Sequence, residues 1–299
     1  MDKGNQGPWA GVSAHHPGAF VRIKSGGVTD VGRVRSNNED CYRIVPEMGL
    51  FVLSDGMGGE AHGEIASAMA VETVVKHCLE GENNPAAPIF GETQPGWSAH
   101  TKRLASAVHL ANRCIFESAA QNPEQQGMGA TVTAAWITGH ELSLAHVGDS
   151  RAYILRAGAL QQLTSDHSLV AEQVRRGILT AAQADESDMQ SVLLRALGTN
   201  PQIEVDAEDH LVFPKDVLLL CSDGLTRMIM EPEIAGALQS EPDSAKAAAR
   251  LVDLANERGG ADNTTVIVVH TDTETRNWFS WLRFGQRKHS NGNGHAGGK

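Results

Sequence analysis

The sequence contains few cysteines and no long hydrophobic run. Its cysteines, Cys41, Cys78, Cys114 and Cys221, form no C-x-x-C pair and show no regular spacing, so neither a zinc site nor a disulfide framework is expected. No run approaches the length of a membrane-spanning helix, and the N-terminus lacks the continuous apolar stretch of a secretory signal. We therefore expect a protein of the reducing cytoplasm, without a transmembrane segment.

The sequence is also short of positive charge. It has 25 Lys and Arg against 36 Asp and Glu, a formal net charge of −11. This balance argues against a protein that coats nucleic acid. An acidic chain is typical of a soluble surface, but also of a site that holds cations.

Composition divides the chain into three parts. Residues 1–24 are rich in Gly, Pro and His and predict a flexible N-terminal arm, whereas residues 25–271 have the patterns of a folded domain. Residues 272–299 form a basic tail that is aromatic at first and then disordered. The sequence WFSWLRF at 278–284 favours either peripheral contact with an anionic membrane or packing onto the domain.

The predicted elements do not alternate regularly between strand and helix. Short apolar runs rich in Val, Ile and Thr predict strands at Cys41–Val45, Leu50–Leu53, Thr131–Thr138, Leu142–Val147, Ala152–Leu155, Val217–Cys221 and Thr264–His270. Longer amphipathic stretches predict helices at Gly63–Leu79, Thr101–Ala120 and Ser244–Glu257. This order predicts an α+β fold with mainly antiparallel sheet rather than a parallel βαβ protein.

Acidic residues recur where the predicted strands begin or end. They are Asp55, Asp149 and Asp223, each beside a glycine, Asp262 before the last strand, and Glu39-Asp40 before an early one. Each alone could belong to a turn. Together they can converge at one sheet edge, where they would repel one another unless cations neutralise them. Oxygen ligands of this kind select hard ions such as Mg²⁺ or Mn²⁺.

Two other motifs point to different functions, but their surroundings do not fit them. Gly56 to Ala61 fits the dinucleotide pattern G-x-G-x-x-A, but Asp55 beside it would repel a pyrophosphate and the surroundings are not βαβ. Gly148 to Ala152 resembles a nucleophile elbow, but a strand-like segment follows where that motif needs a helix.

An ordered set of short motifs spans about residues 27–270. In chain order they are Arg35 with Asn38-Glu39-Asp40, Asp55-Gly56-Met57-Gly58-Gly59, Gly129-Ala130-Thr131, Gly148-Asp149-Ser150-Arg151, Asp166-His167-Ser168, Ser222-Asp223-Gly224 and Asp262-Asn263. This set resembles bacterial members of the protein phosphatase 2C (PPM) family of metal-dependent Ser/Thr phosphatases. The resemblance implies a four-layer αββα sandwich, in which helix pairs flank two mainly antiparallel sheets, with a flap at about residues 166–198.

The resemblance also implies a metal-ligand set of two Mn²⁺ or Mg²⁺ ions. Asp55 would bridge both ions. Asp223 and Asp262 would complete the first site, and Glu39 with the carbonyl of Gly56 would complete the second.

Further roles follow from the same resemblance. Asp40 would hold metal-bound water, Asp149 with Asp223 would serve a third ion, and Arg35 would bind the substrate phosphate. A water shared by the two ions would then attack phosphoserine or phosphothreonine in line with the leaving oxygen. The implied partners are phosphorylated proteins, including a bacterial-type Ser/Thr kinase, and the implied state is a monomer.

This chain departs from the family pattern beside the metal ligands. Met57 stands where eukaryotic relatives carry a histidine proposed to protonate the leaving group, and Glu60 stands where bacterial relatives often have one. The nearest histidine, His62, is therefore a candidate general acid. The alternative function is a catalytically weak pseudophosphatase that acts as a binding or sensing module. The carboxylate retained at every matched ligand position argues against it.

Overall fold

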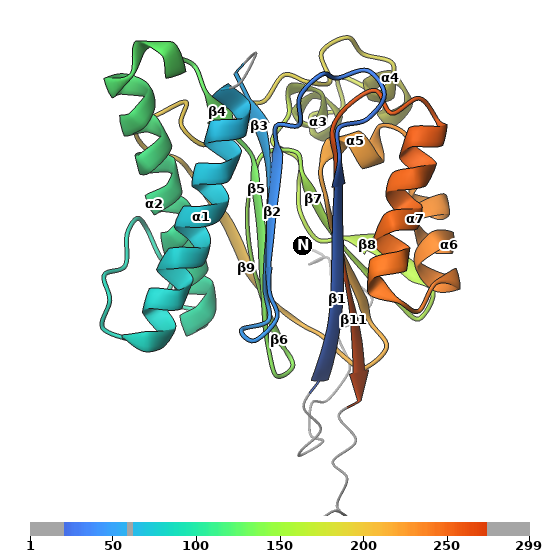
Figure 1. The fold of residues 1–299 in the computed structure, drawn as a ribbon, viewed down its shortest axis with the longest axis horizontal. Coiled ribbons are helices and arrows are strands. Elements are labelled where there is room, and N and C mark those ends of the chain that lie inside the picture. The colour runs from blue at the N-terminus through green and yellow to red at the C-terminus, as the bar shows by residue number, and fades with distance from the viewer. Residues whose placement is uncertain (1–20, 59–61, 274–299) are drawn as a thin grey trace, which may run out of the picture. The chain divides into compact units, whose positions relative to one another are not determined.

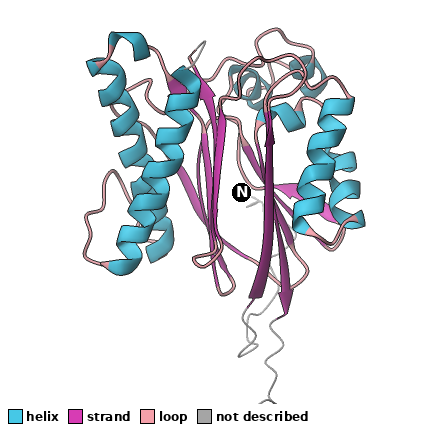
Figure 2. Ribbon diagram, in the orientation of Figure 1, coloured by secondary structure: helices cyan, strands magenta, loops and turns pink. Residues whose placement is uncertain are grey.

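Two antiparallel sheets face each other in the computed structural model, which describes residues 21–58 and 62–273 (Figure 2). In spatial order, the first sheet holds β1 (Val21–Asp30), β11 (Thr264–Thr273), β10 (Val217–Cys221), β7 (Arg151–Arg156) and β8 (Ala159–Gln162). The second holds β2 (Asp40–Val45), β3 (Leu50–Met57), β5 (Val132–Thr138), β6 (Glu141–Val147) and β9 (Asp206–Leu211), with β4 (Gly129–Ala130) paired to the end of β3.

Helices cover the outer face of each sheet (Figure 1). The second sheet carries α1 (His62–Asn83) and α2 (Ala99–Gln121), and the first carries α6 (Glu231–Ser240) and α7 (Ser244–Glu257). Shorter helices are α3 (Leu169–Arg175), α4 (Ala181–Asp185), α5 (Asp223–Thr226) and the 3-10 turn η1 (Pro123–Gln125). This arrangement confirms the predicted α+β sandwich. No helix in the described residues is long and apolar enough to cross a membrane.

The central strands are apolar throughout because both of their faces are buried. In β10, Leu218 and Leu220 contact the opposite sheet, while Leu219 and Cys221 contact the layer of α6 and α7. Side chains alternate between the two faces of a strand. A strand with a layer on each side therefore appears in the sequence as a continuous hydrophobic run.

Helix α7 shows how local sequence sets an element. The side chain of Asp243 accepts hydrogen bonds from the backbone N–H groups of Ala245 and Lys246, which caps the first turn. Ala247 and Leu251 lie on its buried face, as the predicted helix spacing requires.

The folded domain begins earlier and ends later than predicted. Strand β1 starts at Val21, inside the predicted N-terminal arm, and pairs with β11, which continues to Thr273. The sequence of β1 hides it because Gly26 weakens a strand pattern. A Cβ at Gly26 would lie 2.4 Å from the Ala245 Cα atom, so glycine lets α7 rest directly on the strand. The tail at 278–284 lies outside the described residues, as does Glu60.

Candidate active site

The predicted carboxylates gather at one end of the sandwich. Asp40 at the start of β2 is paired with Asp55 near the end of β3. Burial raises the pKa of Asp55 well above its usual range, and the charges of Asp40, Asp223, Asp149 and Asp262 raise it further. Five acidic groups from both sheets therefore act on one another electrostatically.

Asp40 is held in place by a serine from the opposite sheet. The Ser222 hydroxyl donates to Asp40 Oδ2 at 2.8 Å and itself accepts from the backbone N–H of Thr265 at 2.9 Å. Burial raises the pKa of Asp40 to about 7. Its other oxygen, Oδ1, is buried and has no hydrogen-bond partner.

Thr131 joins Asp55 to the turn that carries Asp149. Its Oγ1 accepts from the backbone N–H of Asp55 at 3.0 Å and lies 2.7 Å from Ser150 Oγ. Gly148 in this turn has φ +115°, and a Cβ there would lie 2.6 Å from the Thr131 side chain. Only glycine suits that position. Burial, followed by the charge of Asp223, raises the pKa of Asp149 to about 8.

Asn263 fixes the loop that carries Glu39. Its Oδ1 accepts from the backbone N–H of Glu39 at 2.7 Å, and its Nδ2 donates to the carbonyls of Val31 at 3.0 Å and Asn37 at 2.8 Å. In the sequence, Asn263 stands out only as part of the Asp262-Asn263 motif. Its structural role depends on contacts more than 200 positions away in the chain, which no local pattern reveals.

The beginning of α1 comes very close to Glu39. A Cβ at Gly63 would lie 2.7 Å from the carboxyl carbon of Glu39, and one at Gly56 would lie 2.0 Å from the carbonyl oxygen of Gly63. Burial raises the pKa of Glu39, and the charges of Arg35 and, to a lesser extent, of His62 at the start of α1 lower it in part. A Cβ at Gly129 would lie 2.7 Å from the methyl carbon of Met57, so the Met57 side chain packs closely against Gly129.

Two arginines pair with carboxylates of the cluster. Arg35 donates to Asp262 Oδ2 at 2.9 Å, and its side chain is 54% exposed. Arg227, which belongs to none of the sequence motifs, lies 2.5 Å from Asp223 Oδ2 and 3.6 Å from Asp262 Oδ2. In the sequence, the pairing of Arg227 with Asp223 is indicated only by their spacing of four residues, which brings two side chains together on a helical turn.

The donor set fits divalent cations, although its carboxylates contact arginine. Within residues 21–58 and 62–273, no three acidic, histidine or cysteine side chains converge closely enough to hold an ion directly. All the donors are oxygen atoms, which Mg²⁺ and Mn²⁺ prefer. Asp40 Oδ1 and Asp223 Oδ1 are buried without partners. Mutually repelling carboxylates with unsatisfied buried oxygens are suited to cations once the guanidiniums move aside.

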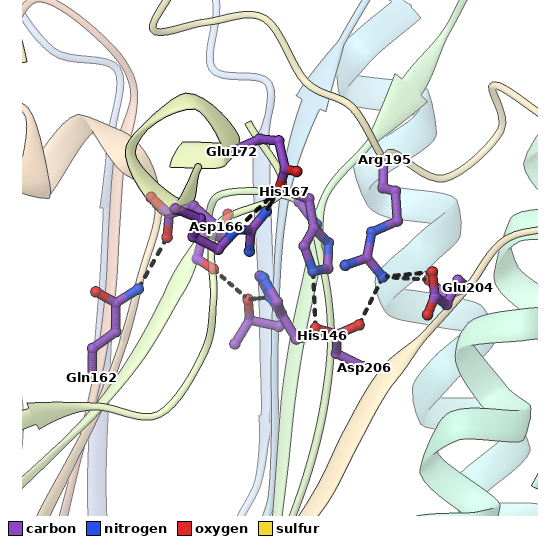
Figure 3. A network of polar contacts seen from close by, with 12 residues as sticks. His146, Gln162, Asp166, His167, Glu172, Arg195, Glu204 and Asp206 are labelled. Atoms are coloured by element: carbon purple, nitrogen blue, oxygen red, sulfur yellow. Dashed lines mark hydrogen bonds and ion pairs between the residues drawn. The ribbon is translucent and has the colours of Figure 1, made fainter. Parts of the chain in front are cut away.

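His167 of the predicted flap is bonded both to the turn that carries Asp149 and to Asp206, and Figure 3 shows its contact with Asp206. The backbone N–H of Gly148 donates to His167 Nδ1 at 3.0 Å, so Nε2 carries the proton and donates to Asp206 Oδ2 at 3.1 Å. Arg195 donates to Asp206 Oδ1 at 2.7 Å. Burial opposes ionisation of Asp206, but these two hydrogen bonds outweigh it and hold the pKa of Asp206 well below its usual range.

A second flap residue binds the neighbouring strand. Asp166 accepts from Arg151 Nε and from Arg151 Nη2, the latter at 2.7 Å, and from Gln162 at 3.0 Å. Asp166 and His167 therefore fasten the predicted flap to β7, to β8 and to the β6–β7 turn. The sequence located this motif but not its contacts.

Comparison with known proteins identifies the family. The model of the protein phosphatase 2C family matches residues 33–266. The chain belongs to the protein phosphatase 2C family. This phosphatase 2C chain is 36% identical over 247 residues to the serine/threonine phosphatase stp of Listeria monocytogenes, covering 82% of this chain and 94% of the relative.

Solved structures agree with this placement. The serine/threonine phosphatase PstP/Ppp of Mycobacterium tuberculosis is 35% identical with a TM-score of 0.73, covering 84% of this chain and 99% of that structure. A PstP catalytic domain in complex with two manganese ions is 34% identical with a TM-score of 0.70, and the coverage is again 84% and 99%. A two-ion Mn²⁺ or Mg²⁺ site in this chain is consistent with that complex.

Proposed function

We propose that this protein hydrolyses phosphoserine and phosphothreonine on proteins and so reverses Ser/Thr kinase signalling. The observation that carries the proposal is the half-exposed Arg35, whose guanidinium is bonded to Asp262 at the edge of a buried carboxylate cluster. An exposed arginine beside a divalent-cation site is suited to a phosphate dianion. The names of the relatives support the same substrate class.

The proposed ligands come from both sheets. Two Mn²⁺ or Mg²⁺ ions would be held by the carboxylates of Asp55, Asp223, Asp262 and Glu39 and by the carbonyl of Gly56, with Asp55 shared between the two. When bound, such ions lower the pKa of water and neutralise phosphate charge. Asp149 with Asp223 is the proposed place for a third ion.

The side chains around the ions orient the reactants. Asp40, fixed by Ser222, has an unpartnered oxygen that can hold a water in line with phosphorus. Arg35 has a planar guanidinium that can bind two phosphate oxygens at once and stabilise charge on the transferring group. These roles need fixed geometry, which the hydrogen bonds of Ser222 and Asn263 supply.

The general acid remains a separate proposal. The thioether of Met57 cannot donate a proton. His62 at the start of α1 is close to Glu39, and we propose it as the group that protonates the leaving oxygen. The further proposals are a cytoplasmic monomer whose partners are phosphoproteins, including a bacterial-type Ser/Thr kinase.

Phosphate release from a phosphothreonine peptide tests the proposed activity. The assay compares EDTA, Mg²⁺ and Mn²⁺ for the wild type, Asp223→Ala and Asp253→Ala, the last being exposed on α7. We expect turnover with Mn²⁺ that is absent with EDTA, falls at least about 10³-fold in Asp223→Ala and is unchanged in Asp253→Ala. Folded wild-type protein that binds Mn²⁺ but releases no phosphate would support the pseudophosphatase alternative instead.

A further inference from the structure

Arg227 lies within the carboxylate cluster and is mostly buried. Its guanidinium contacts Asp223 Oδ2 at 2.5 Å and reaches Asp262 Oδ2 at 3.6 Å, and 24% of its side chain is exposed. Its backbone N–H also donates to the Asp223 carbonyl at 2.9 Å. Arg227 is thus attached to Asp223 through both its main chain and its side chain.

The helix that carries this pair cannot easily shift. A Cβ at Gly224 would lie 2.1 Å from the carbonyl oxygen of Asn263, so α5 rests directly on the loop that leads into β11. Asn263 is itself bonded to three other positions. Any cation that displaces Arg227 therefore has to move its side chain rather than its helix.

The acidic groups of the site outnumber the arginines beside them. The acidic groups are Glu39, Asp40, Asp55, Asp149, Asp223 and Asp262, and the nearby cations are Arg35 and Arg227. When all are ionised, these six carboxylates and two guanidiniums leave four formal negative charges, which two divalent ions neutralise. Without Arg227 the same site would carry one more negative charge and attract a cation more strongly.

Asp223 cannot bind the Arg227 guanidinium and a divalent ion equally well at the same time. A divalent ion on Asp223 would place two positive charges beside the guanidinium, so binding of the ion weakens the ion pair. The other oxygen of Asp223, Oδ1, is buried and unpartnered, which leaves one atom ready for a ligand while Arg227 covers the other. By linkage, whatever favours one cation at Asp223 disfavours the other.

We propose that Arg227 is a resident cation that competes with a divalent ion for Asp223 and so sets the metal concentration at which this phosphatase is saturated. The inference rests on the metal site proposed above. When divalent ions are scarce, Arg227 also shields the carboxylates from one another. A purely local role, support of a short helix through an i,i+4 pair, would affect stability but not metal affinity.

Calorimetric titration of Mn²⁺ without substrate separates these roles. The variants are Arg227→Gln, Arg227→Lys and the control Arg250→Gln, which removes an exposed arginine paired with Glu257 on α7. We expect Arg227→Gln to bind Mn²⁺ about ten-fold more tightly. Arg227→Lys should lie between it and the wild type because lysine keeps the charge but lacks the planar fork. Arg250→Gln should match the wild type.

A melting curve of the metal-free proteins gives a second readout. Arg227→Gln should melt about 2–4 °C below the wild type without metal and should gain more than the wild type when Mn²⁺ is added. If Arg227 only supported the short helix, Arg227→Gln would melt below the wild type by the same amount with and without Mn²⁺.

The outcomes distinguish this inference from the proposed function. If Arg227→Gln binds Mn²⁺ no more tightly than the wild type, the inference on Arg227 is wrong and the metal site stands. If Arg227→Gln does not fold, wild-type affinity in Arg227→Lys overturns the inference in the same way. If the wild type binds no Mn²⁺, the metal site and the inference are both wrong.

Discussion

Asp40 lies directly opposite Asp55 across the antiparallel pair of β2 and β3. Residues paired in this way project from the same face of a sheet, and like charges there destabilise the pair. Both side chains are also largely buried. The fold therefore holds two mutually repelling groups together at the point where cations are proposed to bind.

Replacing one of these two ionisable groups should stabilise the metal-free protein, because two buried carboxyl groups side by side can ionise only at a cost in free energy. We expect Asp55→Asn to raise the free energy of unfolding by about 1 kcal/mol without metal and to abolish the increase in melting temperature that Mn²⁺ gives the wild type. Asp253→Asn on α7 is the control and should change neither quantity. Equal stabilisation of Asp55→Asn and wild type by Mn²⁺ would show that Asp55 is not a ligand.

Asn263 should matter for stability and metal binding together. Asn263→Ala leaves the Glu39 N–H without its acceptor and two carbonyls without their donor, so we expect a loss of about 2 kcal/mol in the free energy of unfolding. Because the Glu39 backbone is then no longer fixed, Mn²⁺ affinity should also fall. Chemical denaturation and Mn²⁺ titration measure both effects.

Asn122→Ala is the matched control for this prediction. Asn122 is exposed at the end of α2, where its side chain bonds only to Ser118 and Gln125. Its loss should change stability by no more than about 0.5 kcal/mol. If Asn263→Ala behaves like Asn122→Ala, the proposed anchoring of Glu39 is wrong.

His62 should determine part of the pH–rate profile. If it protonates the leaving oxygen, His62→Gln lowers kcat about 100-fold and removes the fall in kcat that deprotonation of an acid causes at high pH. His100→Gln, on α2 beside Glu82, should keep the wild-type profile. An identical profile in His62→Gln and wild type would leave proton transfer to another group.

Buried His146 should make the protein less stable as the pH falls toward 4. Burial lowers the pKa of His146 to about 4, and its Nε2 atom is buried without a hydrogen-bond partner. The unfolded chain takes up a proton near pH 6.5, whereas the folded chain does so only near pH 4. Between these values the unfolded state binds more protons, so the free energy of unfolding falls as pH is lowered.

The size of this loss follows from the shift in the pKa. A difference of about 2.5 units corresponds to about 3 kcal/mol between pH 7 and pH 4. Denaturant titrations across this range measure it, and His146→Gln should remove this part of the slope while leaving the curve above pH 7 parallel to that of the wild type. A slope that is unchanged in His146→Gln would assign the acid sensitivity to other groups.

Elements with a strong local pattern could be predicted from the sequence. The doubly buried β10 and β11 appear as apolar runs, and α7 carries both its cap and its amphipathic spacing. Strand β9 was missed because it is the edge strand Asp206–Leu211, whose residues are mostly polar. Strand β1 was missed because its glycines serve contacts with other elements rather than strand formation.

The residues of the candidate site likewise fall into those that the sequence predicts and those that it does not. Acidic residues at strand ends could be found because the sequence shows where each apolar run begins and ends, but their convergence at one end of the sandwich depends on the strand topology. Arg227 and the bond between His167 and Asp206 could not be found, since each depends on which side chains the tertiary fold brings together. The resemblance supplied the ligand roles and Arg35, but neither the ion pair of Arg35 with Asp262 nor Arg227.

The most direct test of the two-cation centre is the position of bound manganese. Crystals of the whole protein soaked in Mn²⁺ and measured at the manganese absorption edge should show two anomalous peaks, with the Asp55 carboxylate between them and Arg35 displaced from Asp262. The proposal that this cluster is the metal centre of a phosphatase would be contradicted by anomalous peaks that lie only elsewhere in the protein. It would also be contradicted if no peak appeared and Arg35 and Arg227 stayed paired with Asp262 and Asp223.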